Sequence, residues 1–205
     1  MLEGKDVACE RGGRALFSHI DFTLDDGGLL QVQGANGSGK TSLLRMVCGL
    51  TPLADGEIRW EGTEIAELGE TYRASLLYLG HHNAIQDSLS ARENLMASAA
   101  LSGVALNDGE AGAALGRIGL RGREDFPSRY LSQGQKRRVA LARLMWSKAR
   151  LWVLDEPFVA LDTAALALLA ETIAGHLARG GLAVLTSHQE VAIAGISAQT
   201  LNLSP

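Results

Sequence analysis

One run of residues constrains the fold of this chain more than any other. The letters GANGSGKT, residues 34–41, fit the pattern G-x-x-x-x-G-K-[ST]. An apolar segment, Leu29–Gln33, leads directly into this run, and the residues from about 39 to 50 are expected to form a helix. Glycines allow the backbone to curl so that successive N–H groups point at phosphate oxygens. A strand, a glycine-rich loop and a helix in this order predict an α/β fold that binds a nucleotide.

The chemistry of this phosphate loop, residues 34–41, assigns roles to its polar side chains. The N-terminal amides and dipole of the following helix attract the same anion as the loop amides. Lys40 supplies a positive charge to the β- and γ-phosphates, and the Thr41 hydroxyl is placed to bind Mg²⁺. We therefore expect ATP and Mg²⁺ to bind here. The expected nucleotide-binding residues are Gly34, Ala35, Asn36, Gly37, Ser38, Gly39, Lys40, Thr41 and Ser42.

A second apolar strand, Leu151–Leu154, ends in two acids, Asp155 and Glu156. The carboxyl ends of parallel strands are where such sheets bind ligands. Asp155 can hold Mg²⁺ directly or through water, and Glu156 can act as the general base that polarises the attacking water. Together with the phosphate loop, the acidic pair predicts hydrolysis of the bound nucleotide.

The order of the remaining segments indicates the class of fold. Apolar strands that alternate with helices favour a mostly parallel sheet covered on both faces, and the strands at the N-terminus suggest an antiparallel β-subdomain. The other expected strands are 20–24, 57–60, 75–79 and 183–186, with a short one near Leu201. The expected helices are 94–101 after a capping box at 90–93, 108–119, one from about Ser132, and Thr163–Ala178.

Composition excludes several functional classes. The chain has 205 residues and a formal net charge of −4, so its charge does not indicate a nucleic-acid binder. Its two cysteines, Cys9 and Cys48, lack metal-ligand spacing, and we interpret them as reduced core thiols, which favours a cytosolic location. No apolar run approaches the roughly 18 residues that cross a bilayer, and the N-terminus does not read as a secretory signal. If the protein works at a membrane, another chain must hold it there.

A short motif in the middle of the chain carries a resemblance to a known family. The letters LSQGQ resemble the LSGGQ signature of ATP-binding-cassette (ABC) ATPases, with glutamine in place of the first glycine. The order of phosphate loop, signature and acidic strand also matches that family over essentially the whole chain. The resemblance implies an α/β fold with a P-loop NTPase core, a mostly parallel sheet, an N-terminal antiparallel β-subdomain and an inserted helical subdomain. It implies a single ATP-binding domain, 1–205, with a core of about 1–80 and 149–205 and a helical subdomain of about 83–148.

In that family the signature opens a helix and contacts the γ-phosphate of ATP bound by the opposite protomer. The resemblance therefore implies a second copy of the chain as partner, with Ser132 and Gly134 as the contacts made in trans. Residues 160–162, ALD, match the loop that touches the partner protomer. The signature residues are Leu131, Ser132, Gln133, Gly134 and Gln135.

Three further positions follow from the same resemblance. His188 matches the family's switch histidine, which would hydrogen-bond the γ-phosphate and join Glu156 and Lys40 as a catalytic residue. His82 stands where the family has a glutamine between the core and the helical subdomain, so it joins Thr41 and Asp155 as a candidate metal-linked residue. Arg11 stands where the family places an aromatic residue against adenine, and a guanidinium can also stack on a base.

Within the family, several stretches resemble the ATP-binding subunits of haem exporters in bacterial cytochrome c maturation. These stretches are 9–11, 16–17, 76–81, 93–95 and 129–135. The resemblance implies a peripheral protein on the cytoplasmic face of the bacterial inner membrane. Its partners would be integral membrane subunits of the cytochrome c maturation haem export complex, docked at the groove around 85–89 and the helical insertion after it. ATP hydrolysis would then power haem export or the release of a haem chaperone.

The sequence also leaves other functions open. The chain could be the ATPase subunit of another small ABC exporter, or a soluble ABC ATPase acting on nucleic acid or ribosomes. Relatives of the second kind usually carry two cassettes or a long coiled-coil insertion, and the chain shows neither. A phosphoryl-transfer kinase would leave the signature and His188 unexplained.

Overall fold

The computed structural model describes residues 1–187, 193 and 195–203. Contacts within the chain define two compact units. The core unit comprises Met1–Gly80, Ala149–Pro157 and Ile173–Pro205, and the helical unit comprises His81–Lys148 and Phe158–Thr172. Within the part of the chain that the structure describes, no helix has both the length and the apolar character needed to cross a membrane.

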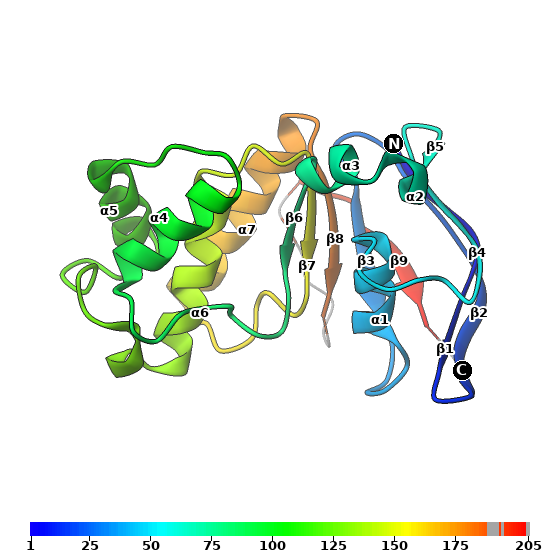
Figure 1. Ribbon diagram of the computed structural model, residues 1–205, viewed down its shortest axis with the longest axis horizontal. Coiled ribbons are helices and arrows are strands. Elements are labelled where there is room, and N and C mark those ends of the chain that lie inside the picture. The colour runs from blue at the N-terminus through cyan, green and yellow to red at the C-terminus, as the bar shows by residue number, and fades with distance from the viewer. Residues whose placement is uncertain (188–192, 194, 204–205) are drawn as a thin grey trace. The chain divides into compact units, whose positions relative to one another are not determined.

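The core unit contains two sheets, and together with the helices they confirm the α/β class (Figure 1). One sheet is five-stranded, with all pairs parallel, in the order β6 (Leu76–Leu79), β7 (Leu151–Leu154), β8 (Leu182–Thr186), β3 (Leu29–Gln33), β9 (Gln199–Asn202). The other is four-stranded and antiparallel, in the order β2 (Arg14–Leu24), β1 (Leu2–Arg11), β4 (Asp55–Trp60), β5 (Thr63–Glu64).

The register of the parallel sheet brings together the segments that matter for function. Every residue of β7 and β8 is buried, as expected for central parallel strands covered on both faces. Leu154 pairs with Leu185, and Val32 pairs with Thr186. The carboxyl ends of β3, β7 and β8 therefore lie at one edge of the sheet, where the phosphate loop and the two acids begin.

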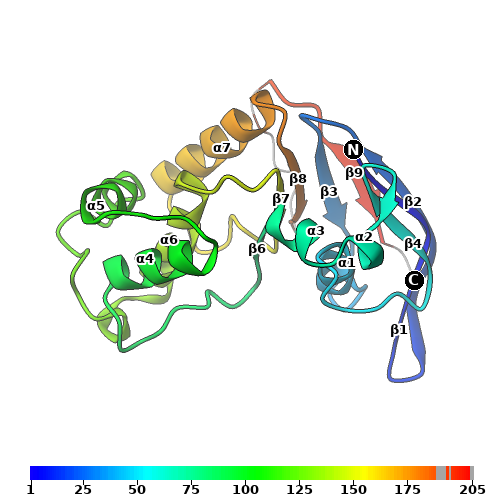
Figure 2. The same cartoon turned by 45° about the horizontal axis from the view of Figure 1, so that its top comes forward.

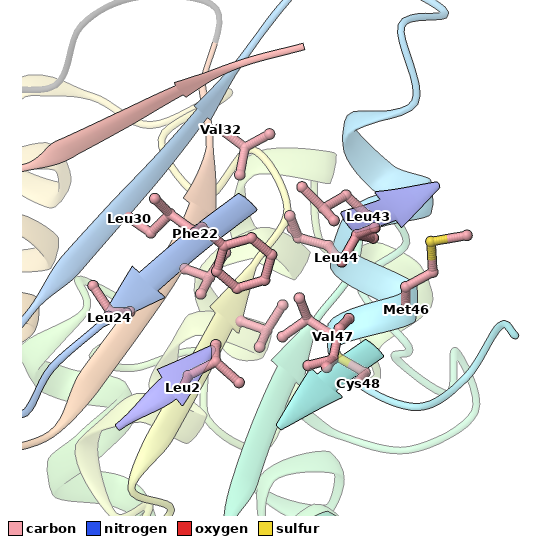
Figure 3. Close-up of a cluster of buried hydrophobic side chains, with 14 of the residues drawn as sticks. Leu2, Phe22, Leu24, Leu30, Val32, Leu43, Leu44, Met46, Val47 and Cys48 are labelled. Atoms are coloured by element: carbon pink, nitrogen blue, oxygen red, sulfur yellow. The ribbon is translucent and has the colours of Figure 1, made fainter. Parts of the chain in front are cut away.

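Helix α1 (Lys40–Val47) packs in the main hydrophobic cluster of the core unit. Leu43, Leu44 and Val47 of this helix are fully buried. Each such side chain contributes roughly 1.5–3 kcal/mol of burial free energy, so the cluster fixes the helix that follows the phosphate loop. Figure 3 labels cluster members from β1 (Leu2), β2 (Phe22, Leu24), β3 (Leu30, Val32) and α1 with its C-cap (Leu43, Leu44, Met46, Val47, Cys48).

Two short helices, α2 (Ile65–Leu68) and α3 (Glu70–Ala74), complete the core unit together with the end of α7 (Thr163–Ala178). The Tyr72 hydroxyl of α3 donates a hydrogen bond to the Val47 carbonyl oxygen, 2.5 Å away. Cys9 and Cys48 are both buried and free. Burial raises the pKa of Cys48 to about 12, so its thiol stays protonated and unreactive at neutral pH.

The helical unit is built around α4 (Ala91–Leu101), α5 (Asp108–Arg117) and α6 (Gln133–Leu141), which lie side by side in Figures 1 and 2. Two 3₁₀ turns, η1 (Ser128–Tyr130) and η2 (Ala142–Met145), flank α6. Each of the three helices begins with a complete capping box, in which side chain and backbone exchange hydrogen bonds. Residues 158–172 belong to the helical unit, whereas the expected core included them.

Candidate functional site

The phosphate loop needs glycine at positions where a side chain would collide with its surroundings. Gly39 has φ +99°, and a Cβ there would lie 2.8 Å from the Phe17 ring. At Gly34, with φ +152°, a Cβ would lie 2.5 Å from Ser38 Oγ. The tight curl predicted from the sequence is thus present, and it leaves no room for a larger residue at either end.

Polar groups of the loop converge on its interior. Lys40 Nζ donates to the carbonyl oxygens of Gly34 and Ala35, at 2.7 and 3.1 Å. Ser38 Oγ is buried and has no hydrogen-bond partner among the described residues. A buried hydroxyl without a partner is unfavourable, so its presence beside a buried ammonium group fits a loop that binds an oxygen-rich anion.

Asp155 lies at the end of β7 and is almost fully buried. Its Oδ2 accepts a hydrogen bond from Thr41 Oγ1 at 2.9 Å, and its Oδ1 accepts one from Thr186 Oγ1 at 2.7 Å. Thr41 and Asp155, the two residues expected to hold Mg²⁺, therefore meet in space. A hydroxyl and a carboxylate are the hard oxygen ligands that Mg²⁺ takes, so the residues present fit this ion. Burial, helped by the charge of Asp155, raises the pKa of Tyr78 on β6 to about 12.

Glu156 follows in a backbone conformation that is rare for residues other than glycine, with φ +48°. Such a left-handed conformation costs about 1–2 kcal/mol and persists only where neighbours hold it in place. The Glu156 amide donates to Thr186 Oγ1 at 2.8 Å. Thr186 was not among the residues predicted from the sequence. The signal that could have found it is a hydroxyl that ends an otherwise apolar strand, LAVLT.

A cavity of about 470 Å³ opens beside the phosphate loop. Arg11 lies at its wall, together with Leu16, which was not among the residues predicted from the sequence. Glu156 also lines it, so the predicted general base reaches the same space as the predicted phosphate ligands. The lining residues are Arg11, Leu16, Asn36, Gly37, Gly39, Lys40, Thr41, Ser42 and Glu156.

The signature residues belong to the helical unit. Ser132 is the N-cap of α6, where its hydroxyl accepts from the Gln135 amide at 3.2 Å and Gln135 Oε1 accepts from the Ser132 amide at 2.9 Å. A Cβ at Gly134 would lie 3.2 Å from the Ala160 carbonyl oxygen, so the signature packs against the loop 160–162. Leu131 is buried, whereas Ser132 and Gln133 are exposed.

The loop 160–162 is itself held by charged groups. Asp162 accepts a hydrogen bond from the Ala165 amide at 2.9 Å and forms an ion pair with Arg138 of α6. These two contacts, the backbone hydrogen bond first, lower the pKa of Asp162. Ala160 adopts a left-handed conformation with φ +62°. The motif matched from the family is thus a shaped turn fixed to the signature helix.

Two other predicted site residues are the histidines His82 and His188, of which the structure describes only the first. His82 is exposed in the helical unit, with its ring 5.7 Å from that of His81, edge to face. Both histidines follow the end of β6 at Leu79, so they lie outside the strand. No group of three or more His, Cys, Asp or Glu side chains suited to a metal ion occurs among the described residues. His188 lies outside the described residues.

Comparison with known proteins agrees with this geometry. The family model for the ABC transporter matches residues 17–159. The chain belongs to the ABC transporter family and is an ATP-binding, ATP-hydrolysing subunit of that class. Two curated relatives carry the name "Cytochrome c biogenesis ATP-binding export protein CcmA". The one from Nitrosospira multiformis is 55% identical over 99% of this chain and 98% of its own length, and the one from Albidiferax ferrireducens is 57% identical over 98% and 96%.

Solved structures show the same fold. An ABC transporter ATP-binding protein from Pyrococcus furiosus superposes with a TM-score of 0.84 at 27% identity, covering 98% of this chain and 96% of that one. A dimeric ATP-binding cassette, solved in a post-hydrolysis state with ADP and Pi, gives a TM-score of 0.77 at 21% identity, covering 92% and 88%. The second likeness extends to the fold alone.

Proposed function

We propose that this chain is the ATP-hydrolysing subunit of a membrane ABC complex in cytochrome c biogenesis. Its cycle would power haem export or the release of a haem chaperone. The single observation that carries this proposal is the likeness to relatives named for that process, at 55–57% identity over nearly the whole of both chains. Another small ABC exporter is the alternative that shares the same site.

The chemistry follows from residues that the fold brings together. Lys40 and the loop amides bind the β- and γ-phosphates of ATP, while Thr41 and Asp155 are the residues that would hold Mg²⁺. Bound Mg²⁺ supplies positive charge that offsets the charge developing on the phosphates. Glu156 accepts the proton of the attacking water, whose oxygen displaces ADP from the γ-phosphorus. His188 and His82 keep their assigned roles, at the γ-phosphate and near the metal, as parts of the same proposal.

The proposed active assembly contains two copies of the chain. Ser132 caps α6 at an exposed position, so its hydroxyl and the neighbouring amide of Gly134 can meet a nucleotide bound by a second copy. The loop 160–162, held to α6 by the ion pair between Asp162 and Arg138, would lie at the same interface. Each site would then be completed only when two chains close over ATP.

We further propose that the complex is peripheral on the cytoplasmic face of the bacterial inner membrane, bound to integral membrane subunits. The segment 85–89 is the proposed docking surface. It is held in shape by Asn94, which exchanges hydrogen bonds with the backbone of Gln86, and by the ion pair between Asp87 and Lys136. Nucleic acid is not a proposed partner, given the net charge of −4.

The test is replacement of the native gene in its host by a Glu156→Gln variant. The variant protein should still bind ATP but lose hydrolysis by at least about a hundredfold, the usual contribution of a general base. We expect c-type cytochromes that carry covalently attached haem to disappear from haem-stained gels. The matched control is Glu171→Gln, the same change at an exposed position of α7, which should leave the cytochromes unchanged.

Normal haem-bearing cytochromes in a strain that accumulates the Glu156→Gln protein would contradict the assignment to cytochrome c biogenesis. If that protein also turned over ATP at the wild-type rate, Glu156 would not be the base. Loss of another exported compound, with cytochromes intact, would instead support the alternative exporter.

A further inference from the structure

Thr186 is the last residue of β8 and is completely buried. Its hydroxyl lies between the two acids of the neighbouring strand end. It accepts a hydrogen bond from the Glu156 amide at 2.8 Å and donates one to Asp155 Oδ1 at 2.7 Å. One hydroxyl thus bridges the residue proposed to bind the metal and the residue proposed as base.

The surroundings of Thr186 indicate that this hydroxyl has a purpose other than filling space. The four residues before it in β8 are apolar and buried, and a buried hydroxyl is unfavourable unless it is hydrogen-bonded. Valine has nearly the same shape and would suit such a strand better. The hydroxyl is compensated here because both its donor and its acceptor capacity are used on the acidic pair.

The bond to Glu156 falls at a point of backbone strain. Glu156 has φ +48°, a conformation that a non-glycine residue keeps only when other groups hold it. The hydrogen bond from its amide to Thr186 is one such group. Without it, the backbone at Glu156 is free to relax toward an ordinary conformation, which would turn the carboxylate away from the nucleotide cavity that it lines.

The bond to Asp155 has a complementary effect. Asp155 receives one hydroxyl on each oxygen, Thr41 on Oδ2 and Thr186 on Oδ1. The Thr41 hydroxyl donates its hydrogen to Asp155, so its lone pairs stay available for the metal of which it is a proposed ligand. Thr186 does not line the cavity and can keep hold of Oδ1 throughout.

We propose that Thr186 is a positioning residue for ATP hydrolysis. It holds the Asp155 carboxylate for the metal and fixes the left-handed turn that aims Glu156 at the water. This inference rests on the proposed function, because it concerns the same site. Thr186 touches neither ATP nor Mg²⁺ in this role and acts only through the two acids.

The test compares two substitutions in the complete chain. Thr186→Val removes the hydroxyl and keeps the shape, and Thr186→Ser keeps the hydroxyl. We expect Thr186→Val to lower kcat roughly tenfold, to change the KM for ATP by less than about twofold, and to raise several-fold the Mg²⁺ concentration at half-maximal rate. Thr186→Ser should recover kcat and the Mg²⁺ requirement to within about twofold of wild type.

A matched control separates the effect of losing the hydroxyl at Thr186 from the general effect of replacing a threonine by valine. Thr172→Val makes the same replacement in α7, where the hydroxyl donates to the Leu168 carbonyl oxygen of its own helix, at 2.7 Å. It should leave kcat and the Mg²⁺ requirement as in wild type. The Mg²⁺-dependent affinity for ATP, measured by fluorescence of a labelled nucleotide, provides a second readout that does not require turnover.

The outcomes separate this inference from the function on which it rests. If wild type hydrolyses ATP and Thr186→Val matches it in both kcat and Mg²⁺ requirement, the positioning role is wrong and the ATPase assignment stands. Equal losses in Thr186→Val and Thr186→Ser, with lowered melting temperatures, would show a structural role only. A wild-type chain that neither binds nor hydrolyses ATP would overturn both proposals.

Discussion

The two helix starts that we propose bind phosphate are built in different ways. At α1, the N-cap is Gly39, which makes no side-chain hydrogen bond to the helix. At α6, the N-cap is Ser132, which forms a complete capping box with Gln135. The first helix start leaves its backbone amides for a ligand. The second uses side chains of its own capping box to accept hydrogen bonds from two of its backbone amides.

This difference indicates a division of labour between the two helix starts. The α1 start is surrounded by buried polar groups, Lys40 and Ser38, and by a fixed core, which suits the proposed binding site within one chain. The α6 start is exposed and already stable, because its box uses the amides of Ser132 and Gln135. The amides between them, at Gln133 and Gly134, remain for a ligand that arrives later. We therefore expect the phosphate loop to control affinity and the signature to control turnover.

Substitution of the loop lysine should have the largest effect in this comparison. Lys40→Ala removes a charge-assisted contact that is worth about 1.5–3 kcal/mol, so ATP affinity should fall roughly ten- to hundredfold. The measurement is the Kd of the isolated chain for ATP by titration calorimetry. Unchanged affinity would refute the role of Lys40. It would also contradict the expectation that the loop before α1, and not the signature at α6, controls affinity.

How far the sequence alone leads can be judged from the same two regions. The strand Leu29–Gln33, the phosphate loop, the strand Leu151–Leu154 and the helix Thr163–Ala178 are all visible as local patterns, and the structure has these elements. Local signals also predict the capping box of α4, because all of its hydrogen bonds lie within four consecutive residues. The α1 helix is shorter than expected, since Cys48 caps it and Gly49, with φ +66°, turns the chain away.

What the sequence could not reveal depends on contacts between distant segments. Thr186 reaches Glu156 and Asp155 across 30 and 31 residues. The local pattern, a hydroxyl that ends an apolar strand, marks Thr186 as unusual but does not say which side chains it contacts. Leu16 reaches the nucleotide cavity from the second strand of a hairpin. The grouping of 158–172 with the helical unit is likewise a tertiary property, and one contact between these parts of the chain is the ion pair between Asp162 and Arg138.

Two N-cap serines in the helical unit distinguish a role of the signature in turnover from a role in stability. Ser132→Ala and Ser90→Ala remove the same N-cap hydroxyl from α6 and α4, both at complete capping boxes in the helical unit. Each should lower the free energy of unfolding by about 1 kcal/mol, the usual contribution of such a cap. Only Ser132→Ala should also lower kcat, by roughly tenfold, because its hydroxyl is proposed to meet the second copy's ATP.

Ser90→Ala serves as the matched control. Urea unfolding measures the loss of unfolding free energy that both variants share, and steady-state hydrolysis measures the loss of kcat expected only for Ser132→Ala. The ATP affinity of the isolated chain should be unchanged in both variants. If the two variants lost activity in equal proportion, the signature serine would be only a helix cap, and the contrast between the two helix starts would fail.

The smallest predicted effect is on ATP affinity and concerns Arg11, which lies at the wall of the cavity and is the residue expected to stack on adenine. If the phosphate loop supplies most of the affinity, Arg11→Ala should weaken ATP binding only about two- to fivefold, the scale of an exposed stacking contact of about 0.5–1 kcal/mol. Arg11→Tyr should restore or improve affinity, because an aromatic ring stacks on adenine as well. Affinities for ATP and for inorganic triphosphate, measured side by side, separate the two contributions. Arg11→Ala could instead lower the affinity for both ATP and triphosphate as much as Lys40→Ala does. That result would mean that Arg11 binds phosphate. The anion site would then extend beyond the loop and the α1 helix start.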